Sequence, residues 1–287
     1  MDIRRLTDAD LPVVTVLLDS DPIAAAMLSA RLHMAGVSRS GGDLWGTFHQ
    51  GRLLALAHSG ATLTVSSPAD DTAIATAGEA VAALGTLLHR FPRRCVSIIG
   101  PSRLVAHLWP PLAPVWGPPR DVRPQQPLLL ARGQASVDPA GHRAVPPTVT
   151  FATPEDVGAL YQPSLDMFTE EVGVSPLHGS SEQAYWNRLA LMVSQQRVLI
   201  AKDAHGVVFK AEIAAVTPHT CHIQGVWVRP NLRGRGIGTR AMVQTVAIAR
   251  RFAPSVSLYV NDYNIPALRA YAHAGFHQVG TMATIHF

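Results

Sequence analysis

Cysteine is scarce in this chain, and long apolar runs are absent. Only Cys95 and Cys221 occur among the 287 residues, and they lie far apart. Two distant thiols exclude a disulfide framework and a zinc site made of cysteine pairs, and they favour a reducing compartment. No uninterrupted run approaches the ~18 apolar residues that a membrane-spanning helix needs, and acidic residues interrupt the first segment. We therefore expect neither a signal peptide nor a membrane helix, and residence in the cytoplasm.

Charged residues are also few, at 15% of the chain, and they include no basic run with interleaved aromatics. The formal net charge is only +4. A nucleic-acid-binding surface is therefore not expected, and neither is a membrane partner. Among the thirteen histidines, His205, His219 and His222 lack compact spacing with carboxylates, so no metal is expected.

The length exceeds that of one typical domain. A single domain usually holds about 100–150 residues, so 287 residues predict two. The hydrophobic content of 47% allows each domain a core of its own. The composition therefore fits a folded, two-domain protein.

The segment 226–239 has the pattern of an anion-binding turn. A β-branched strand runs into a turn rich in glycine and arginine, and a helical pattern follows directly. Glycines let successive backbone N–H groups approach an anion at a helix N-terminus, where the helix dipole adds positive potential. The residues of the turn are Arg233, Gly234, Arg235, Gly236 and Gly238. They predict a cradle for a pyrophosphate.

The spacing separates this turn from two other phosphate-binding loops. A P-loop needs a Gly-Lys pair, and the sequence contains none. A Rossmann fingerprint reads Gly-x-Gly-x-x-Gly, whereas this turn reads Gly-x-Gly-x-Gly. Both are disfavoured.

The turn resembles the acetyl-CoA loop of the GNAT superfamily of N-acetyltransferases. Its pattern, Gln/Arg-x-x-Gly-x-Gly/Ala, is matched by Arg233, Gly236 and Gly238. A predicted strand at 257–260 then leads into a second motif of the superfamily, Asn-x-x-Ala-x-x-x-Tyr-x-x-x-Gly-Phe. The matching residues are Asn264, Ala267, Tyr271, Gly275 and Phe276. Without the first motif, the second would read as a plain amphipathic helix with Tyr271 in the core.

The resemblance covers about the C-terminal half of the chain. It implies direct acetyl transfer from acetyl-CoA, a cosubstrate, with no metal and no covalent intermediate. It further implies a sheet in which two strands splay apart beside a bulge, and Gly225 is the expected point of distortion. The implied cofactor contacts are Val226, Val228, Arg233, Gly234, Arg235, Gly236, Ile237, Gly238, Thr239 and Asn264.

Tyr271 occupies the position of the residue that protonates the departing CoA thiolate. An amine acceptor must also lose a proton, and the sequence leaves open which residue acts as the base. His222, six residues before Val228, aligns with a glutamate of several family members, but it reads equally well as an ordinary strand histidine. Glu212 and Glu171, the latter next to Glu170, are the alternatives.

The two halves of the chain share a layout that indicates an internal repeat. Thr7 and Asp10 follow a short strand, as Thr153 and Asp156 do, and a hairpin pattern follows at 44–57 and at 198–209. An unrelated α/β domain with chance similarity is the alternative. After the predicted strand 94–99 comes Gly-Pro-Ser-Arg instead of a cofactor loop, so no second acetyl-CoA site is expected there.

The predicted fold class is α/β (α+β), with tandem GNAT-like domains. Each domain has a mixed, mostly antiparallel sheet flanked by helices. A degenerate N-terminal domain at 1–118, a Pro/Gly-rich linker at 119–145 with a candidate strand at 126–131, and a catalytic domain at 146–287 are expected, as in actinobacterial two-domain GNAT proteins.

The expected activity is acetyl-CoA-dependent N-acetyl transfer to an amine of a small molecule or a protein. The alternative is an acyl-CoA-binding sensor or regulatory module without turnover. The sequence leaves the acceptor open, and it leaves open whether the protein is a monomer or a homodimer.

Overall fold

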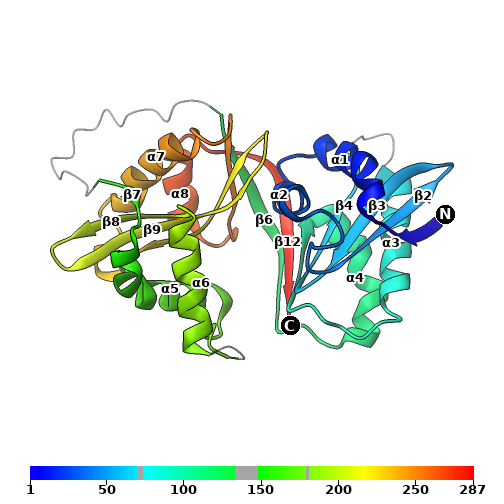
Figure 1. Cartoon of the computed structure of the whole chain (residues 1–287), viewed down its shortest axis with the longest axis horizontal. Helices are drawn as coiled ribbons and strands as arrows, with labels where there is room; N and C mark the ends of the chain where they lie inside the picture. Colours follow the sequence, from blue (N-terminus) through cyan, green and yellow to red (C-terminus); the bar gives the residue numbers. More distant parts are fainter. Residues whose placement is uncertain (70–73, 133–147, 179–180) are drawn as a thin grey trace. The chain divides into compact units, whose positions relative to one another are not determined.

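The chain forms two compact units in the computed structural model, which describes residues 1–69, 74–132, 148–178 and 181–287 (Figure 1). The first unit comprises Met1–Leu129, Tyr259–Tyr263 and Gln278–Phe287. The second comprises Leu130–Leu258 and Asn264–His277. Within the described ranges, no helix is both long enough and apolar enough to span a membrane.

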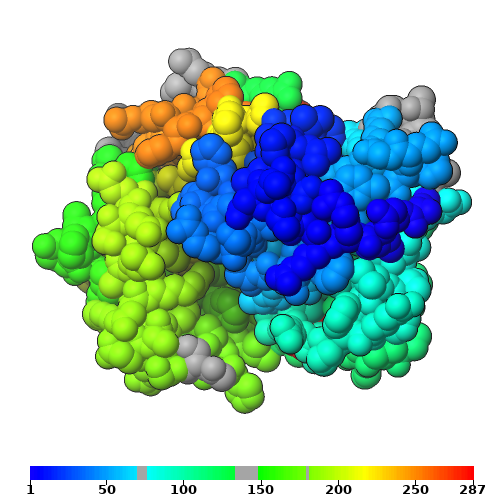
Figure 2. All heavy atoms as spheres, turned by 45° about the vertical axis from the view of Figure 1, so that its right-hand side comes forward, coloured from blue at the N-terminus to red at the C-terminus, as the bar shows by residue number. Residues whose placement is uncertain are grey.

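The first unit is built on one mixed sheet in the order β1-β2-β3-β4-β5-β12-β6. Its strands are β1 (Asp2–Arg5), β2 (Asp43–His49), β3 (Arg52–Ser59), β4 (Thr62–Ser66), β5 (Ser97–Pro101), β6 (Asp121–Ala131) and β12 (His277–His286). Its helices are η1 (Asp8–Asp10), α1 (Leu11–Ser20), α2 (Ala26–Ala35), α3 (Ile74–Leu88) and α4 (Ser102–Trp116). In Figure 2 the blue residues, which include β1, α1 and α2, lie on the surface of this unit.

The second unit has a sheet in the order β11-β10-β9-β8-β7. Its strands are β7 (Thr150–Phe151), β8 (Val198–Asp203), β9 (Gly206–Val216), β10 (Cys221–Val228) and β11 (Val256–Tyr259). Its helices are η3 (Pro154–Asp156), α5 (Val157–Val172), α6 (Glu182–Ser194), η4 (Pro230–Leu232), α7 (Ile237–Ala249) and α8 (Ile265–His273). Figure 1 shows α5 and α6 on one side of this sheet and α7 and α8 on the other.

The predicted repeat is present in the topology. In the first unit β1, β2, β3 and β4 pair antiparallel in turn, and β4 pairs parallel with β5. In the second unit β7, β8, β9 and β10 follow the same pattern, and β10 pairs parallel with β11. Each unit is therefore a mostly antiparallel sheet flanked by helices, as predicted.

The first turn of each unit is fixed by the same side-chain pair. The backbone N–H of Thr7 donates to Asp10 Oδ2 at 2.8 Å, and that of Thr153 donates to Asp156 Oδ2 at 2.9 Å. These bonds satisfy a donor that the start of a helix leaves unpaired. The threonine and aspartate matched in the sequence therefore cap the first helical turn of both units in the same way.

The topology corrects the place where a second cofactor loop was sought. The strand after Arg94 is β5, whose counterpart in the second unit is β11. The counterpart of β10 is β4, because each is the strand that pairs antiparallel with the strand before it and parallel with the strand after it. The relevant turn therefore follows Ser66, and it falls partly in 70–73, outside the described residues.

The division into units differs from the expected domain limits at two strands. The expected linker 119–145 contains all of β6, an eleven-residue strand, most of which belongs to the first unit. The strand β12, expected in the catalytic domain 146–287, pairs antiparallel with β5 through Met282↔Pro101 to His286↔Ser97. Ala283 and Ile285 of β12 lie in the core of the first unit, so burial of apolar surface holds the strand there.

Candidate active site

The strand β10 is distorted at the place the sequence predicted. Its pairing with β9 runs Gln224↔Glu212 and then Trp227↔Lys210, so β10 holds one residue more than β9 between these pairs. Gly225 lies in this bulge with φ +59°, a conformation that favours glycine. The expectation of a bulge at Gly225 is confirmed.

The same strand separates from β11. The two strands pair only at Cys221↔Val256 and His222↔Ser257, although β10 continues to Val228. Val226 and Val228 are half-buried in this splayed part. Backbone groups along one edge of β10 are therefore not paired with β11, as the predicted splay requires.

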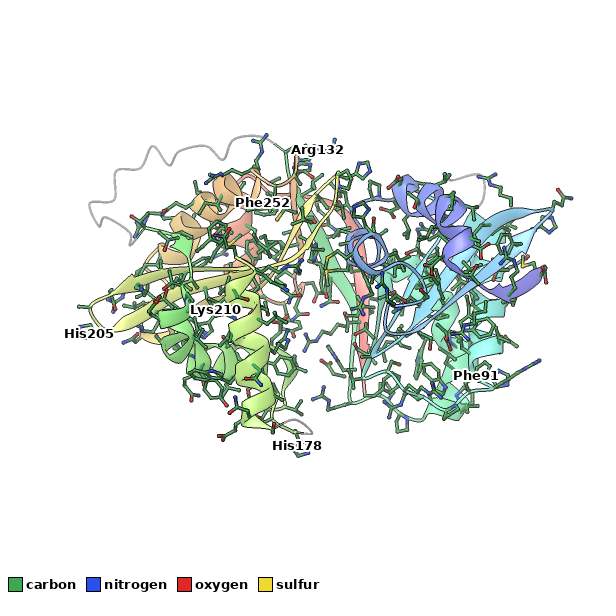
Figure 3. The ribbon with its side chains drawn as sticks, viewed as in Figure 1. Phe91, Arg132, His178, His205, Lys210 and Phe252 are labelled. Carbon is green, nitrogen blue, oxygen red and sulfur yellow. The ribbon has the colours of Figure 1, made fainter. Side chains whose placement is uncertain are left out.

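Glu212 lies directly over the bulge. A Cβ added to Gly225 would stand 2.9 Å from Cδ of Glu212, so the carboxylate occupies the space that the missing side chain leaves. Lys210 Nζ donates to Glu212 Oε1 at 2.7 Å, and Gln224 Nε2 donates to Oε2 at 3.2 Å. The Lys210 side chain is 0% exposed and that of Glu212 is 7% exposed. Figure 3 shows Lys210 within the sheet of the second unit.

Burial and the neighbouring Lys210 have opposite effects on the pKa of Glu212. Burial favours the neutral acid and would raise the pKa, but the Lys210 ammonium, the Gln224 amide and the positive charge of Arg188 outweigh it. The pKa of Glu212 is therefore lowered, and the group is a carboxylate at neutral pH. Burial, together with the smaller effect of the Glu212 charge, raises the pKa of Tyr185 on α6 to about 12.

His222 lies in the closed part of the sheet. It is paired with β9 through Ala215 and with β11 through Ser257, it is 3% exposed, and its Nδ1 lies 3.0 Å from Ser257 Oγ. Burial lowers its pKa to about 4. The structure therefore disfavours His222 as the base, because counting six residues back from Val228 passes through the bulge and ends where the strand is paired on both sides.

The glycine turn precedes α7 as predicted. Gly234 and Gly236 have φ values of +75° and +74°, and a Cβ added to Gly234 would meet no atom within 4 Å. Gly238 lies where a Cβ would come within 3.2 Å of Val228 Cγ2, so its lack of a side chain lets α7 approach β10. Helix α7 begins at Ile237, with Thr239 in its first turn. The turn thus leaves open space in front of the unpaired N–H groups that begin a helix.

Two of the four arginines near this turn are bound to acidic side chains. Arg229 makes two hydrogen bonds with Asp203, at 2.9 and 3.1 Å. Arg233 makes two with Glu170 of α5, at 2.7 and 2.8 Å, and its Nε donates to the carbonyl of Val228. Arg235 and Arg240 make no ion pair with any residue of the described ranges. These two supply positive charge that remains available to an anion.

Tyr271 is buried on α8. It is 7% exposed, and its ring centroid lies 5.8 Å from that of Phe276. Burial raises its pKa, and the negative charge of the exposed Glu171 raises it further. The phenol therefore keeps its proton at neutral pH, as a proton donor must. Asn264 caps the helix, because its Oδ1 accepts from the backbone N–H of Ala267 at 3.2 Å.

The structure thus brings some of the predicted residues together. Glu212 lies at the bulge near Val226, and the charge of Glu171 raises the pKa of Tyr271. The sequence reasoning missed Lys210, Gln224 and the aromatic residues of α5 and α6. A Lys-x-Glu pair inside an apolar strand was the available signal, since residues two apart share a face of a strand.

Five buried polar atoms of the second unit lack a hydrogen-bond partner among the described residues. Tyr161 Oη and Ser164 Oγ lie on α5, Trp227 Nε1 lies on β10, and Arg240 Nε and Thr245 Oγ1 lie on α7. Tyr161 also packs against Tyr185 and Trp186, with ring centroids 5.8 and 5.6 Å away. Helix α5 therefore presents polar and aromatic groups on the side of β10 that holds Trp227.

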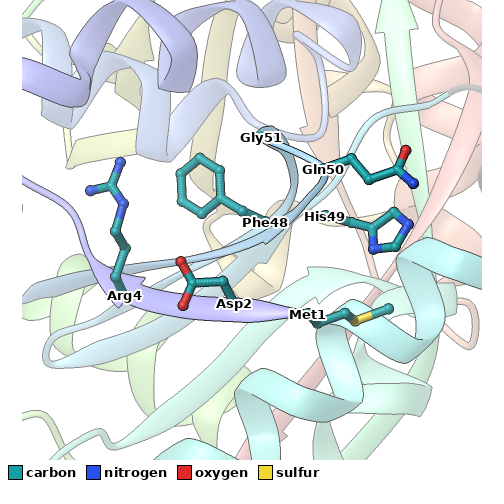
Figure 4. Close-up of a pocket in the computed structure, with 7 residues that line it drawn as sticks. All are labelled: Met1, Asp2, Arg4, Phe48, His49, Gln50 and Gly51. Atoms are coloured by element: carbon teal, nitrogen blue, oxygen red, sulfur yellow. The ribbon is translucent and has the colours of Figure 1, made fainter.

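A surface hollow of about 390 Å³ in the first unit is separate from these residues (Figure 4). It is lined by Met1, Asp2, Arg4, Phe48, His49, Gln50 and Gly51. Arg4 lies over the Phe48 ring at 4.6 Å and is also bonded to Asp10. The hollow contains none of the residues predicted to be catalytic.

Comparison with known proteins identifies the domain that carries the bulge and the glycine turn. Residues 178–276 match the model of the acetyltransferase (GNAT) family. The chain carries a GNAT acetyltransferase domain. Residues 42–158 match a domain of unknown function, DUF4081. No curated protein matches the chain.

Solved structures, two of them described as GNAT proteins, share the fold of the whole chain at low sequence identity. An acetyltransferase from the GNAT family of Colwellia psychrerythraea is 12% identical with a TM-score of 0.56, and all of both chains is covered. A tandem GNAT protein from the clavulanic acid biosynthesis pathway is 14% identical with a TM-score of 0.54, covering 99% of this chain and 97% of that one. A Drosophila protein is 13% identical with a TM-score of 0.61, covering 99% and 98%. These structures support the tandem fold.

Proposed function

We propose that the protein is an acetyl-CoA-dependent N-acetyltransferase that acts on an amine of a small molecule or a protein in the cytoplasm. The observation that carries this proposal is the combination of the bulge at Gly225, the separation of β10 from β11, and the open glycine turn at the start of α7. A nucleotide-bearing thioester fits this arrangement, because the turn has room and the helix start favours a pyrophosphate. Bound there, acetyl-CoA would supply the activated acyl group.

Each part of the site has a role in this proposal. The turn from Arg233 to Thr239 binds the pyrophosphate, and the unpaired edge of Val226 and Val228 binds the pantetheine arm and polarises the thioester carbonyl. The buried phenol of Tyr271 donates its proton to the departing thiolate.

Glu212 acts on the acceptor nitrogen. A carboxylate of lowered pKa is a weak base toward an ammonium group, so the acceptor must react as the neutral amine. Once the neutral nitrogen has attacked the carbonyl it carries a positive charge, which makes its protons acidic enough for Glu212 to take one of them. We therefore expect turnover to rise with pH toward the pKa of the acceptor amine.

Calorimetry with acetyl-CoA tests the cofactor site. Wild type, Gly236→Glu and Tyr271→Phe are compared, and thiol release with a panel of amines is followed in the same samples. We expect Gly236→Glu to abolish binding, because it puts a carboxylate where the pyrophosphate lies. Tyr271→Phe should keep binding and slow thiol release by about 10²-fold, within the usual range for one acid–base group.

Gly117→Glu is the matched control for the loop variant. Gly117 also has a positive φ, +79°, with nothing within 4 Å of an added Cβ, but it lies in the first unit. It should bind acetyl-CoA as wild type does. Absence of binding by the wild type would refute the proposal.

The alternative function is acyl-CoA binding without turnover, as in a sensor or regulatory module. It is favoured by one observation: both Glu212 and His222 have lowered pKa values, so neither is a strong base. Tight acetyl-CoA binding, with no thiol release from any amine between pH 7 and 10, would support this alternative.

A further inference from the structure

We propose that Lys210 is a positioning residue, whose buried ammonium holds the Glu212 carboxylate against Gly225 and thereby fixes the bulge that receives the thioester. The geometry behind this is independent of turnover. The proposal rests on the proposed function only in naming acetyl-CoA as the ligand of the bulge.

The carboxylate of Glu212 is held on both oxygens. Lys210 donates a hydrogen bond to Oε1 at 2.7 Å, and Gln224 donates one to Oε2 at 3.2 Å. The two donors come from different strands, β9 and β10. Charge-assisted hydrogen bonds are about twice as strong as neutral ones, so the Lys210 contact is the stronger of the two. Removing it would leave the carboxylate with a single neutral donor.

The contact with Gly225 gives this ion pair its importance for the bulge. A side chain at residue 225 would come within 2.9 Å of the carboxyl carbon, so the carboxylate and the bulged backbone fill adjacent space. Movement of the carboxylate would therefore change the packing on which the bulge depends. The cofactor-binding edge formed by Val226 and Val228 begins directly after that glycine.

A purely structural role is a poor explanation for two buried charges. Burying an ion pair is often no better for stability than a well-packed apolar pair of the same volume. Lys210 is 0% exposed and shares a face of β9 with Glu212, in a strand that is otherwise apolar. The titratable groups that face Glu212 from the neighbouring helix α6 are Arg188 and the neutral phenol of Tyr185, and neither replaces the contact of Lys210 with Oε1.

The test uses the full chain, and the readouts need no acceptor. Wild type, Lys210→Met, Lys210→Arg, Glu212→Gln and the double variant Lys210→Met/Glu212→Gln are compared. The titration of the Glu212 carboxyl is followed by ¹³C NMR and assigned by its absence in Glu212→Gln. Acetyl-CoA affinity is measured by calorimetry, and stability by thermal unfolding.

Positioning by Lys210 predicts a distinctive set of results. In Lys210→Met the Glu212 carboxyl should bind its proton at least tenfold more tightly than in the wild type, and acetyl-CoA affinity should fall at least tenfold. Lys210→Arg should restore much of both. The double variant should regain thermal stability, because no unpaired buried charge remains, but it should not regain affinity.

Three results would overturn the proposal. The first is a wild-type Glu212 that titrates at or above the ordinary value, which requires no variant to fold. The second is a folded Lys210→Met protein with unchanged titration and affinity. The third is full affinity in the double variant. Failure of the proposed function is distinguishable, because the wild type would then not bind acetyl-CoA while the titration of Glu212 could still be measured.

Discussion

Gly225 shows how one missing side chain shapes the site. Its φ of +59° and the nearby Glu212 carboxylate both oppose a Cβ. We expect Gly225→Ala to destabilise the second unit by about 1–3 kcal/mol, of which about 1 comes from the positive φ. The loss of stability is measured by chemical denaturation and, separately, by hydrogen exchange of the backbone amides of β10.

Gly234→Ala is the control for this substitution. Its φ is +75°, but an added Cβ meets nothing within 4 Å, so it carries the conformational cost alone. The contact with Glu212 would be disproved if the two variants lost the same stability.

His222 makes stability depend on pH. Burial lowers its pKa to about 4, below the ordinary ~6.5, so the unfolded chain binds a proton where the folded chain does not. The stability that His222 contributes is therefore present above pH 6.5 and is lost as the pH falls toward 4, by about 3 kcal/mol.

Proton NMR of the imidazole checks this expectation directly. We expect the His222 resonance to stay constant from pH 8 to pH 5, because the buried imidazole remains neutral over this range. Titration of His222 near 6.5 would contradict the burial argument and restore it as a candidate base.

What the sequence could predict differs from residue to residue. Gly225 was predictable because a glycine inside a strand has few other uses, and Asn264 because helix caps are local. The roles of Lys210 and His222 were not, because they depend on the register between β9 and β10, which the bulge changes. Register is a long-range property, and local patterns do not contain it.

Among the elements, α5 contacts the glycine turn through an ion pair between Glu170 and Arg233. Arg233 binds Glu170 with both Nη atoms, and this contact lowers the pKa of Glu170. Because the pair is about half exposed, it adds little stability, but it neutralises an arginine that an anion could use.

We expect Glu170→Gln to raise acetyl-CoA affinity about threefold, as judged from an exposed ion pair worth less than 1 kcal/mol. Calorimetry at low and high salt measures the change, which should shrink at high salt. Asp166→Asn removes the same charge one turn earlier on α5 and should have a smaller effect. Equal effects from both variants would mean that only the net charge matters.

The helices and hairpins themselves were predictable. The hairpins at 44–57 and 198–209 and the helix after Asn264 are confirmed, because their turns and caps are encoded within a few residues. The position of β12 was not, because its hydrophobic pattern fits either sheet.

In the molecule as a whole, β12 contributes to a core made mostly by distant residues. Ile285 is 2% exposed and pairs with Ile98 of β5, whereas Val279 of the same strand is 44% exposed. We expect Ile285→Ala to cost about 2–4 kcal/mol and Val279→Ala to cost little. Hydrogen exchange at Ile98 measures the effect, and unchanged protection there would contradict the assignment of β12 to the first unit.

The place of β12 also governs the order in which the protein can be completed during synthesis. The ribosome makes β1 to β6 first, then the whole second unit, and only afterwards the strand 277–286 that pairs with β5. Until then β5 has an unpaired edge, and such edges promote aggregation. The core of a nascent first unit therefore lacks Ala283 and Ile285 until the second unit has been translated.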